Sequence, residues 1–267
     1  MSHPKALEEY LVPGTKTTYY VPNFIDEEEE EYLIRKIVDA PQPWWKRLQN
    51  RSASVIGGEL TAKKVLIPQE MPNFVNMYPD LIGRIRDTGI FEGSKHGEPN
   101  HIIMNEYAPG QGIMPHEDGP AYHPVVATLS LGAHTVFNYY QYKPDDPPAP
   151  SDTPPAPEAQ RTGRAIDPKP VLRLLLEPRS LVITTSSMYA DHLHGIDELY
   201  VDKFEIDGTT PEERIANFDA LKDPAARAAV EAGGILERGL RYSLTCRDVE
   251  KVTLMGGALL KKLLGQQ

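Results

Sequence analysis

The sequence predicts a mainly β fold with flanking helices (α+β), built around an antiparallel β-sandwich. Two observations carry this prediction. From His101 onward, short runs of strand-forming residues are separated by turns that contain glycine and proline, as in two packed antiparallel sheets. Before residue 100, apolar residues recur at helical spacing, so this part is expected to add helices that flank the sheets.

The first elements are a predicted strand over Thr17–Phe24 and a helix that follows it. Asp26 is a suitable helix N-cap, and Glu27–Glu31 place acidic groups in the first turn, where they complement the helix dipole. We therefore interpret the acidic run as a helix start rather than a functional patch. The predicted apolar stripe of this helix consists of Leu33, Ile34, Ile37 and Val38.

A second helix is predicted within Pro72–Thr88, although Pro79 would kink or restart it because proline lacks a backbone donor. Its expected apolar residues are Val75, Met77, Leu81, Ile82 and Ile85. The strands of the sandwich are then predicted over His101–Tyr107, Val125–Leu131, Thr135–Tyr142, Val171–Leu176, Ser180–Thr185 and Gly239–Val249.

Two stretches interrupt the strand pattern. Residues 143–170 are rich in proline and hold few large apolar side chains, so they are predicted to form a flexible loop or an extended linker. A proline-motif ligand for another protein is the alternative. Residues Pro211–Ala232 are predicted to form a helical insertion, and Leu254–Leu264 a short helix near the C-terminus.

Composition and charge narrow the class of protein. No apolar run approaches the ~20 residues that span a bilayer, and the single cysteine, Cys246, excludes an internal disulfide framework. We expect a monomer, not bound to membranes, in the cytoplasm, the nucleus or both. The net charge of -10 is a poor background for nucleic-acid binding. The stretch Trp44–Arg51 combines aromatic and basic residues that suit nucleic acid, but an amphipathic surface segment explains it better.

A candidate metal site begins with His116 and Asp118. Side chains two residues apart on an extended chain point the same way, so this pair can bind one metal. Two His and one carboxylate form the ligand set of non-haem Fe(II) oxygenases. The third ligand is expected from His192 or His194, and we favour His194 because Gly195 lets the backbone approach closely.

The last predicted strand supplies a candidate anion site. Alternation places four polar residues on one face: Arg241, Ser243, Thr245 and Arg247. Arginines buried in a sandwich need partners, and a dicarboxylate co-substrate is one. A solvated edge strand with ordinary ion pairs is the alternative. Asn105 and Tyr107 share a face of their strand and could bind the same carboxylate, or serve only as a turn contact and a core residue.

These motifs together resemble the AlkB family of Fe(II)/2-oxoglutarate-dependent dioxygenases. The three matching blocks are Asn105-x-Tyr107-x-x-Gly110 with His116-x-Asp118, then His194, then Arg241-x-Ser243-x-Thr245-x-Arg247. The resemblance covers most of residues 19–249 and is strongest to the branch called the sixth AlkB homologue of animals and plants. Ser243 departs from the family, which mostly carries asparagine there; a hydroxyl reaches less far.

The resemblance implies a double-stranded β-helix (jelly-roll) over residues 101–253, with insertions at 143–170 and 208–234. Residues 1–100 would form a strand-helix unit and substrate lid, and residues 254–267 a C-terminal helix. It implies that Fe(II) is held by His116, Asp118 and His194. It also implies a 2-oxoglutarate site formed by Asn105, Tyr107, Arg241, Ser243 and Arg247.

The implied activity is oxidative N-demethylation of alkylated DNA or RNA, with O₂ and 2-oxoglutarate consumed. One alternative keeps the oxygenase but gives it a protein or small-molecule substrate. Another is a weakly active jelly-roll protein that binds partners. The specificity-determining lid is expected around residues 44–58.

Overall fold

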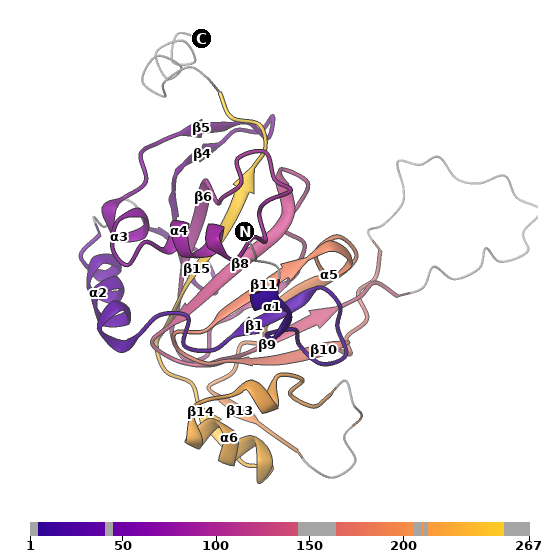
Figure 1. Ribbon diagram of the computed structural model, residues 1–267. Helices are drawn as coiled ribbons and strands as arrows, with labels where there is room; N and C mark the ends of the chain where they lie inside the picture. Colours follow the sequence, from indigo (N-terminus) through magenta and orange to yellow (C-terminus); the bar gives the residue numbers. More distant parts are fainter. Residues whose placement is uncertain (1–4, 41–44, 144–163, 206–209, 211–212, 254–267) are drawn as a thin grey trace, which may run out of the picture.

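Two antiparallel sheets face each other at the centre of the protein (Figure 1). The computed structural model describes residues 5–40, 45–143, 164–205, 210 and 213–253. The larger sheet has the order β1 (Thr18–Val21), β11 (Leu181–Thr185), β8 (Tyr122–Leu131), β15 (Arg241–Val249), β6 (His101–Tyr107), β3 (Ser52–Ile56) and β2 (Lys46–Arg47). The smaller sheet has the order β10 (Leu172–Leu176), β9 (Thr135–Tyr140), β12 (Leu193–Ile196) and β7 (Ile113–His116).

The strand order is that of a jelly roll, as predicted. From β6 to β15 the chain passes repeatedly between the sheets: β6, β8, β11 and β15 lie in the larger sheet, whereas β7, β9, β10 and β12 lie in the smaller one. Such a double-sheet arrangement is the jelly-roll architecture. The N-terminal strands β1, β2 and β3 extend the larger sheet at its two edges, where β1 pairs with β11 and β3 pairs with β6.

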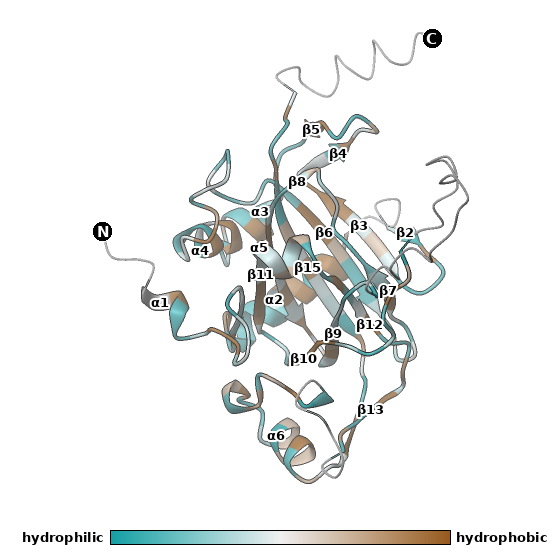
Figure 2. Ribbon diagram, turned by 90° about the vertical axis from the view of Figure 1, so that its right-hand side faces the viewer, coloured by the Kyte–Doolittle hydropathy of each residue, from teal (hydrophilic) through white to brown (hydrophobic). Residues whose placement is uncertain are grey.

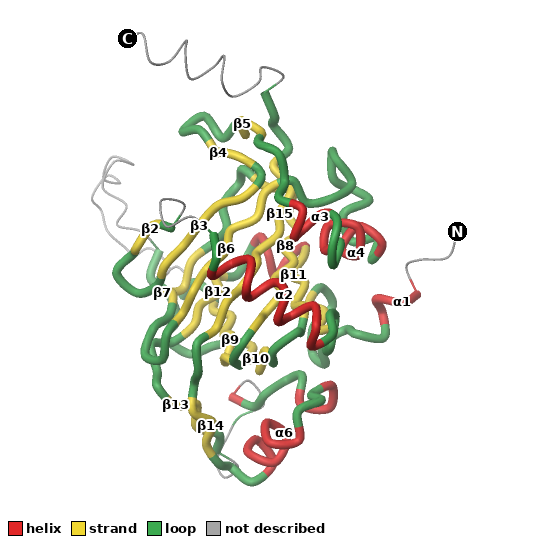
Figure 3. The backbone as a smooth tube through the Cα atoms, turned by 90° about the vertical axis from the view of Figure 1, so that its left-hand side faces the viewer, coloured by secondary structure: helices red, strands yellow, loops and turns green. Residues whose placement is uncertain are grey.

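Helices cover the outer face of the larger sheet (Figure 3). These are α2 (Glu27–Val38), α3 (Asn73–Asn76) and α4 (Leu81–Asp87). Leu33 and Ile37 of α2 and Ile85 of α4 join one buried cluster with Leu244 and Cys246 of β15. The apolar face of β15 is therefore turned toward the helices, and its polar face toward the smaller sheet.

Helix α2 begins as the sequence predicts. The Asp26 side chain accepts from the Glu29 backbone N–H at 2.9 Å, and the Glu29 side chain accepts from the Asp26 N–H, which completes a capping box. Glu29 also pairs with Arg84 of α4, and Glu30 pairs with Arg179 at 2.8 Å. The buried part of the acidic run thus serves to dock the helix.

Two details of the helix predictions were wrong. Val38 is 55% exposed and Met77 is 68% exposed, because each lies where its helix ends and the next segment turns away. The segment Pro72–Thr88 contains two helices rather than one, and Asp80 caps the second by accepting from the Gly83 backbone N–H. This restart after Pro79 had been foreseen.

The insertion before β15 is only partly helical, which corrects the prediction for Pro211–Ala232. Its α-helix is α6 (Pro224–Glu231), preceded by a 3-10 turn, η4 (Phe218–Ala220), and flanked by the paired strands β13 (Val201–Lys203) and β14 (Ile235–Glu237). Proline at the first position starts α6, with Asp223 as N-cap. Asn217 connects the insertion to β10: its side-chain oxygen accepts from the Leu175 backbone N–H and its Nδ2 donates to the Leu175 carbonyl, each at 2.9 Å.

The insertion lies at the opposite end of the sandwich from the hairpin of β4 (Gly58–Leu60) and β5 (Leu66–Pro68) (Figure 2). Short helices α1 (Lys5–Glu8) and α5 (Ser186–Ala190) complete the described elements. The described helices include none long and apolar enough to cross a membrane. The predicted proline-rich loop falls largely on residues 144–163, and the predicted C-terminal helix on residues 254–264; both lie outside the described residues.

Candidate active site

The three proposed metal ligands meet at one end of the smaller sheet. His116 ends β7 and His194 lies on β12, directly opposite it in the strand register. Asp118 follows in the turn after β7. Each of the three offers a ligand atom, and these atoms all lie within 4.8 Å of one another. The half-buried His192 does not belong to this group of ligand atoms, and its Nδ1 lies 3.0 Å from the Ser187 carbonyl oxygen.

Neighbouring groups orient these side chains. His116 Nδ1 lies 2.9 Å from the Met114 carbonyl, so Nδ1 carries the proton and Nε2 is left with its lone pair. Asp118 Oδ1 accepts a hydrogen bond from Arg247. The other oxygen, Oδ2, is buried without a protein partner among the described residues. An unsatisfied buried carboxylate oxygen beside two imidazoles fits a divalent cation.

The electrostatics favour a metal in the same place. Burial lowers the pKa of His194 to about 4 and also lowers that of His116, so both imidazoles are neutral near pH 7. Burial alone would raise the pKa of Asp118, but Arg247 and His194 outweigh it and hold this pKa below its usual value. Two neutral histidines and an ionised carboxylate are in the protonation states that metal ligation requires.

The candidate co-substrate site lies on the inner faces of β15 and β6. Their register pairs Arg241 with Tyr107, and Ser243 with Asn105. Strand β15 is central in the larger sheet, which excludes the alternative of a solvated edge strand. The Asn105 amide approaches the Ser243 hydroxyl at 3.5 Å. All four side chains therefore face the smaller sheet across the sandwich.

Arg241 has fewer partners than a buried cation needs. It is 3% exposed, and its Nη2 donates to the Ser130 hydroxyl at 2.8 Å. Its Nε and Nη1 are buried with no partner in the described part of the chain. The guanidinium lies over the Tyr107 ring, 5.5 Å from its centroid. Burial lowers the pKa of Arg241 to about 10, so the group stays protonated at neutral pH and requires an anion.

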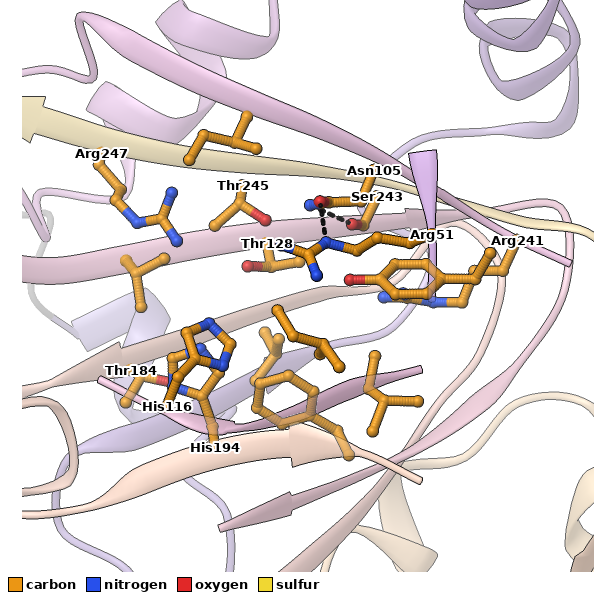
Figure 4. Close-up of a pocket in the computed structure, with 17 residues that line it drawn as sticks. Arg51, Asn105, His116, Thr128, Thr184, His194, Arg241, Ser243, Thr245 and Arg247 are labelled. Carbon is orange, nitrogen blue, oxygen red and sulfur yellow. Dashed lines mark hydrogen bonds between the residues drawn. The ribbon is translucent and has the colours of Figure 1, made fainter. Parts of the chain in front are cut away.

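One cavity of about 80 Å³ connects the two ends (Figure 4). It is lined by all the predicted site residues except Asp118, which bonds Arg247 at its edge. Its remaining lining residues are Arg51, Ile103, Ile113, Val126, Thr128, Phe137, Val182, Thr184, Ile196 and Thr245. The cavity thus extends from the metal-ligand cluster to Arg241, whose guanidinium has no ion-pair partner among the described residues. Apolar and hydroxyl side chains complete its lining.

Three residues of this site were not predicted from the sequence. Phe137 stacks on His194, with ring centroids 5.3 Å apart and planes at 22°. Ser130 anchors Arg241, and Arg51 donates to Asn105 Oδ1 at 3.1 Å. Strand alternation could have indicated Ser130, which shares a face of β8 with Thr128. No local pattern assigns Arg51 to the site, because the segment that carries it reaches the site through long-range strand pairing.

Comparison with known proteins agrees with this geometry. The family model described as the 2OG-Fe(II) oxygenase superfamily matches residues 17–247. The chain belongs to this superfamily. It therefore uses Fe(II), 2-oxoglutarate and O₂, as the sequence analysis predicted. Family membership makes the chain an oxygenase, and the alternative of a weakly active jelly-roll protein that binds partners stays a hypothesis.

Two similar proteins and one solved structure were compared with the chain. The chain is 34% identical over 247 residues to the "Probable RNA/DNA demethylase ALKBH6" of Danio rerio, with 92% of each chain covered, which confirms the AlkB family. It is 32% identical to the uncharacterized protein L905 of Acanthamoeba polyphaga mimivirus, over 46% of this chain and 57% of that one. Among solved structures, OsALKBH1 aligns with a TM-score of 0.49 at 12% identity, covering 89% of this chain and all of the other.

Proposed function

We propose that this oxygenase removes N-alkyl groups from nucleic acid by oxidation, with Fe(II) held by His116, Asp118 and His194. The observation that carries the site assignment is the shared cavity. Its lining includes His116 and His194, with Asp118 at the edge, and also Arg241, whose Nε and Nη1 have no partner among the described residues. A metal-ligand cluster and a buried guanidinium that line one cavity suit a co-substrate with a carboxylate at each end.

In this proposal, each polar residue has a separate task. Arg241 binds the distal carboxylate of 2-oxoglutarate while resting on Tyr107, and Asn105 and Ser243 hydrogen-bond the co-substrate from β6 and β15. Arg247 holds Asp118 in place, which is the contact that the structure shows. The bound iron would supply O₂ activation, with oxidative decarboxylation of 2-oxoglutarate to succinate and CO₂. Hydroxylation of an N-methyl group then yields formaldehyde and the demethylated nitrogen.

Two observations support nucleic acid as the substrate class. The relative from Danio rerio is named a probable RNA/DNA demethylase, and the alignment spans nearly the whole chain. On the edge strand β2, Lys46 and Arg47 are exposed, and β3 connects that edge to the site. Trp45 packs against the core cluster, so it is not free to stack on bases with its whole ring. A cytoplasmic or nuclear location stays a prediction.

The test combines two products. The iron-loaded protein is incubated with 2-oxoglutarate and methylated or unmethylated oligonucleotides of RNA and DNA, and succinate and formaldehyde are measured. We expect formaldehyde only with methylated strands. Asp118→Ala should abolish both products, whereas Asp191→Ala, which removes an exposed carboxylate near the site, should preserve them.

Other outcomes distinguish the alternatives. Succinate formation that no oligonucleotide stimulates and that yields no formaldehyde would contradict the nucleic-acid substrate while retaining the oxygenase. A protein or small-molecule substrate, which the acidic net charge of -10 favours, would then be the better hypothesis. Equal turnover in wild type and Asp118→Ala would contradict the proposed metal site.

A further inference from the structure

Arg51 reaches the cavity from outside the jelly-roll strands. It lies directly before β3, the strand that pairs with β6. Its Nε donates to Asn105 Oδ1 at 3.1 Å. Figure 4 shows the Arg51 side chain pointing into the cavity, with its guanidinium between the histidine pair and Arg241 in this view. The N-terminal segment therefore contributes a cation to the candidate co-substrate site.

The cavity carries positive charge that its own residues do not neutralise. Three arginines line it, and its lining includes no carboxylate among the described residues. Arg247 is paired with Asp118 at the edge. Arg51 and Arg241 donate hydrogen bonds to neutral groups, the Asn105 amide oxygen and the Ser130 hydroxyl. Two partly desolvated guanidinium groups with neutral partners favour an anionic ligand between them.

The strand register locates Arg51 along the cavity. Its partner Asn105 is two residues from Tyr107, which faces Arg241, and four residues from His101, which faces Arg247. At the rise of a β-strand, these separations are roughly 7 Å and 14 Å. Arg51 is thus anchored nearer to the Arg241 end than to the metal end.

We propose that Arg51 is a second arginine for the distal carboxylate of 2-oxoglutarate and acts together with Arg241. The proposal rests on the assignment of this cavity to 2-oxoglutarate. The short Ser243 hydroxyl beside Asn105 leaves the longer guanidinium to supply donors at this point. Because Arg51 adjoins the edge hairpin β2–β3, co-substrate binding would also tie this hairpin to the core.

The test compares two ligands that differ only at the distal end. Full-length protein loaded with Mn(II) is titrated calorimetrically with 2-oxoglutarate and with 2-oxopentanoate, in which a methyl group replaces the distal carboxylate. We expect Arg51→Ala to weaken 2-oxoglutarate binding roughly 10- to 100-fold and to leave 2-oxopentanoate binding unchanged. Arg51→Lys should be intermediate, because it keeps the charge but loses the planar fork.

Arg35→Ala is the matched control, because this exposed arginine on α2 carries the same charge outside the cavity. A second readout is amide hydrogen exchange of residues 45–56, which 2-oxoglutarate should slow in wild type and less in Arg51→Lys. If Arg51→Ala fails to fold, the affinity of Arg51→Lys for the two ligands tests the proposal instead.

Two results would overturn the assignment of Arg51 alone. Wild-type affinity for 2-oxoglutarate in Arg51→Ala would show that Arg51 does not bind it. An equal loss for both ligands would place its effect at the metal end or on the fold. Failure of the wild-type protein to bind 2-oxoglutarate would instead overturn the cavity assignment, and the role of Arg51 with it.

Discussion

The side chains at the metal end of the cavity make separate and testable contributions. His116 offers Nε2 because its Nδ1 faces the Met114 carbonyl. We expect His116→Ala to reduce Mn(II) affinity by at least about 100-fold, since ligand loss exceeds the 10- to 100-fold typical of outer-shell changes. Paramagnetic relaxation of water protons would measure the bound Mn(II). His192→Ala is the control: it removes a histidine of the same segment that points elsewhere, and it should bind Mn(II) like wild type.

Buried His101 makes the stability of the metal-free protein depend on pH. Burial, aided by the nearby Arg247, lowers its pKa from 6.5 to about 4. Between these values the unfolded chain binds a proton that the folded chain does not, so stability is full above pH 6.5 and declines as pH falls toward 4.

We therefore expect the urea midpoint of the metal-free protein to fall between pH of about 7 and about 5, and to fall less in His101→Gln. Other buried histidines contribute equally to both proteins, so the difference isolates His101. An identical pH dependence in the two proteins would refute this assignment. His192→Gln, which changes a histidine that is only half-buried, should behave like wild type.

At the scale of elements, α2 depends on its capping box for both start and docking. Asp26 accepts the Glu29 backbone N–H, while Glu29 pairs with Arg84. Asp26→Ala should lower the free energy of unfolding by about 1 kcal/mol, the usual cost of losing an N-cap. Urea unfolding measures the loss. Glu28→Ala, an exposed change in the same turn, should cost less, and a larger loss there would contradict the capping argument.

The central strand β15 shows how one element separates two environments. Leu244 and Cys246 enter the cluster under the helices, whereas Arg241 and Arg247 enter the cavity. The alternation was readable from the sequence. The central position of β15 in the sheet could not be predicted from the sequence. It depends on pairing with β6 and β8, and the sequence of a strand does not specify which strands pair with it.

At the scale of the whole molecule, the net charge of -10 opposes the binding of nucleic acid, so such binding needs a local basic surface. The exposed Lys46 and Arg47 form a local basic site on the edge strand β2. If they contact phosphates, replacing either with alanine should weaken oligonucleotide binding and reduce the slope of log affinity against log salt by about 1. Fluorescence anisotropy at several salt concentrations tests this. Lys203→Ala, an exposed change on β13 in the distant insertion, serves as control; an unchanged slope in both Lys46→Ala and Arg47→Ala would contradict the prediction.

The sequence by itself determined the chemistry available and most of the local structure. The His116-x-Asp118 spacing and the alternating face of residues 241–247 follow from backbone geometry that neighbouring residues fix. The strands over residues 101–107, 125–131 and 171–176 were predicted for the same reason. The family resemblance also depended only on these local motifs and their order.

Only the tertiary structure decided which side chains share one cavity. It selected His194 over His192 by placing β12 opposite β7, and it brought Arg51 to Asn105 through the pairing of β3 with β6. It also showed that Arg241 keeps two donors without partners among the described residues. These features depend on strand register and burial between segments that are far apart in the sequence. A local segment contains only one of the two partners in each such contact.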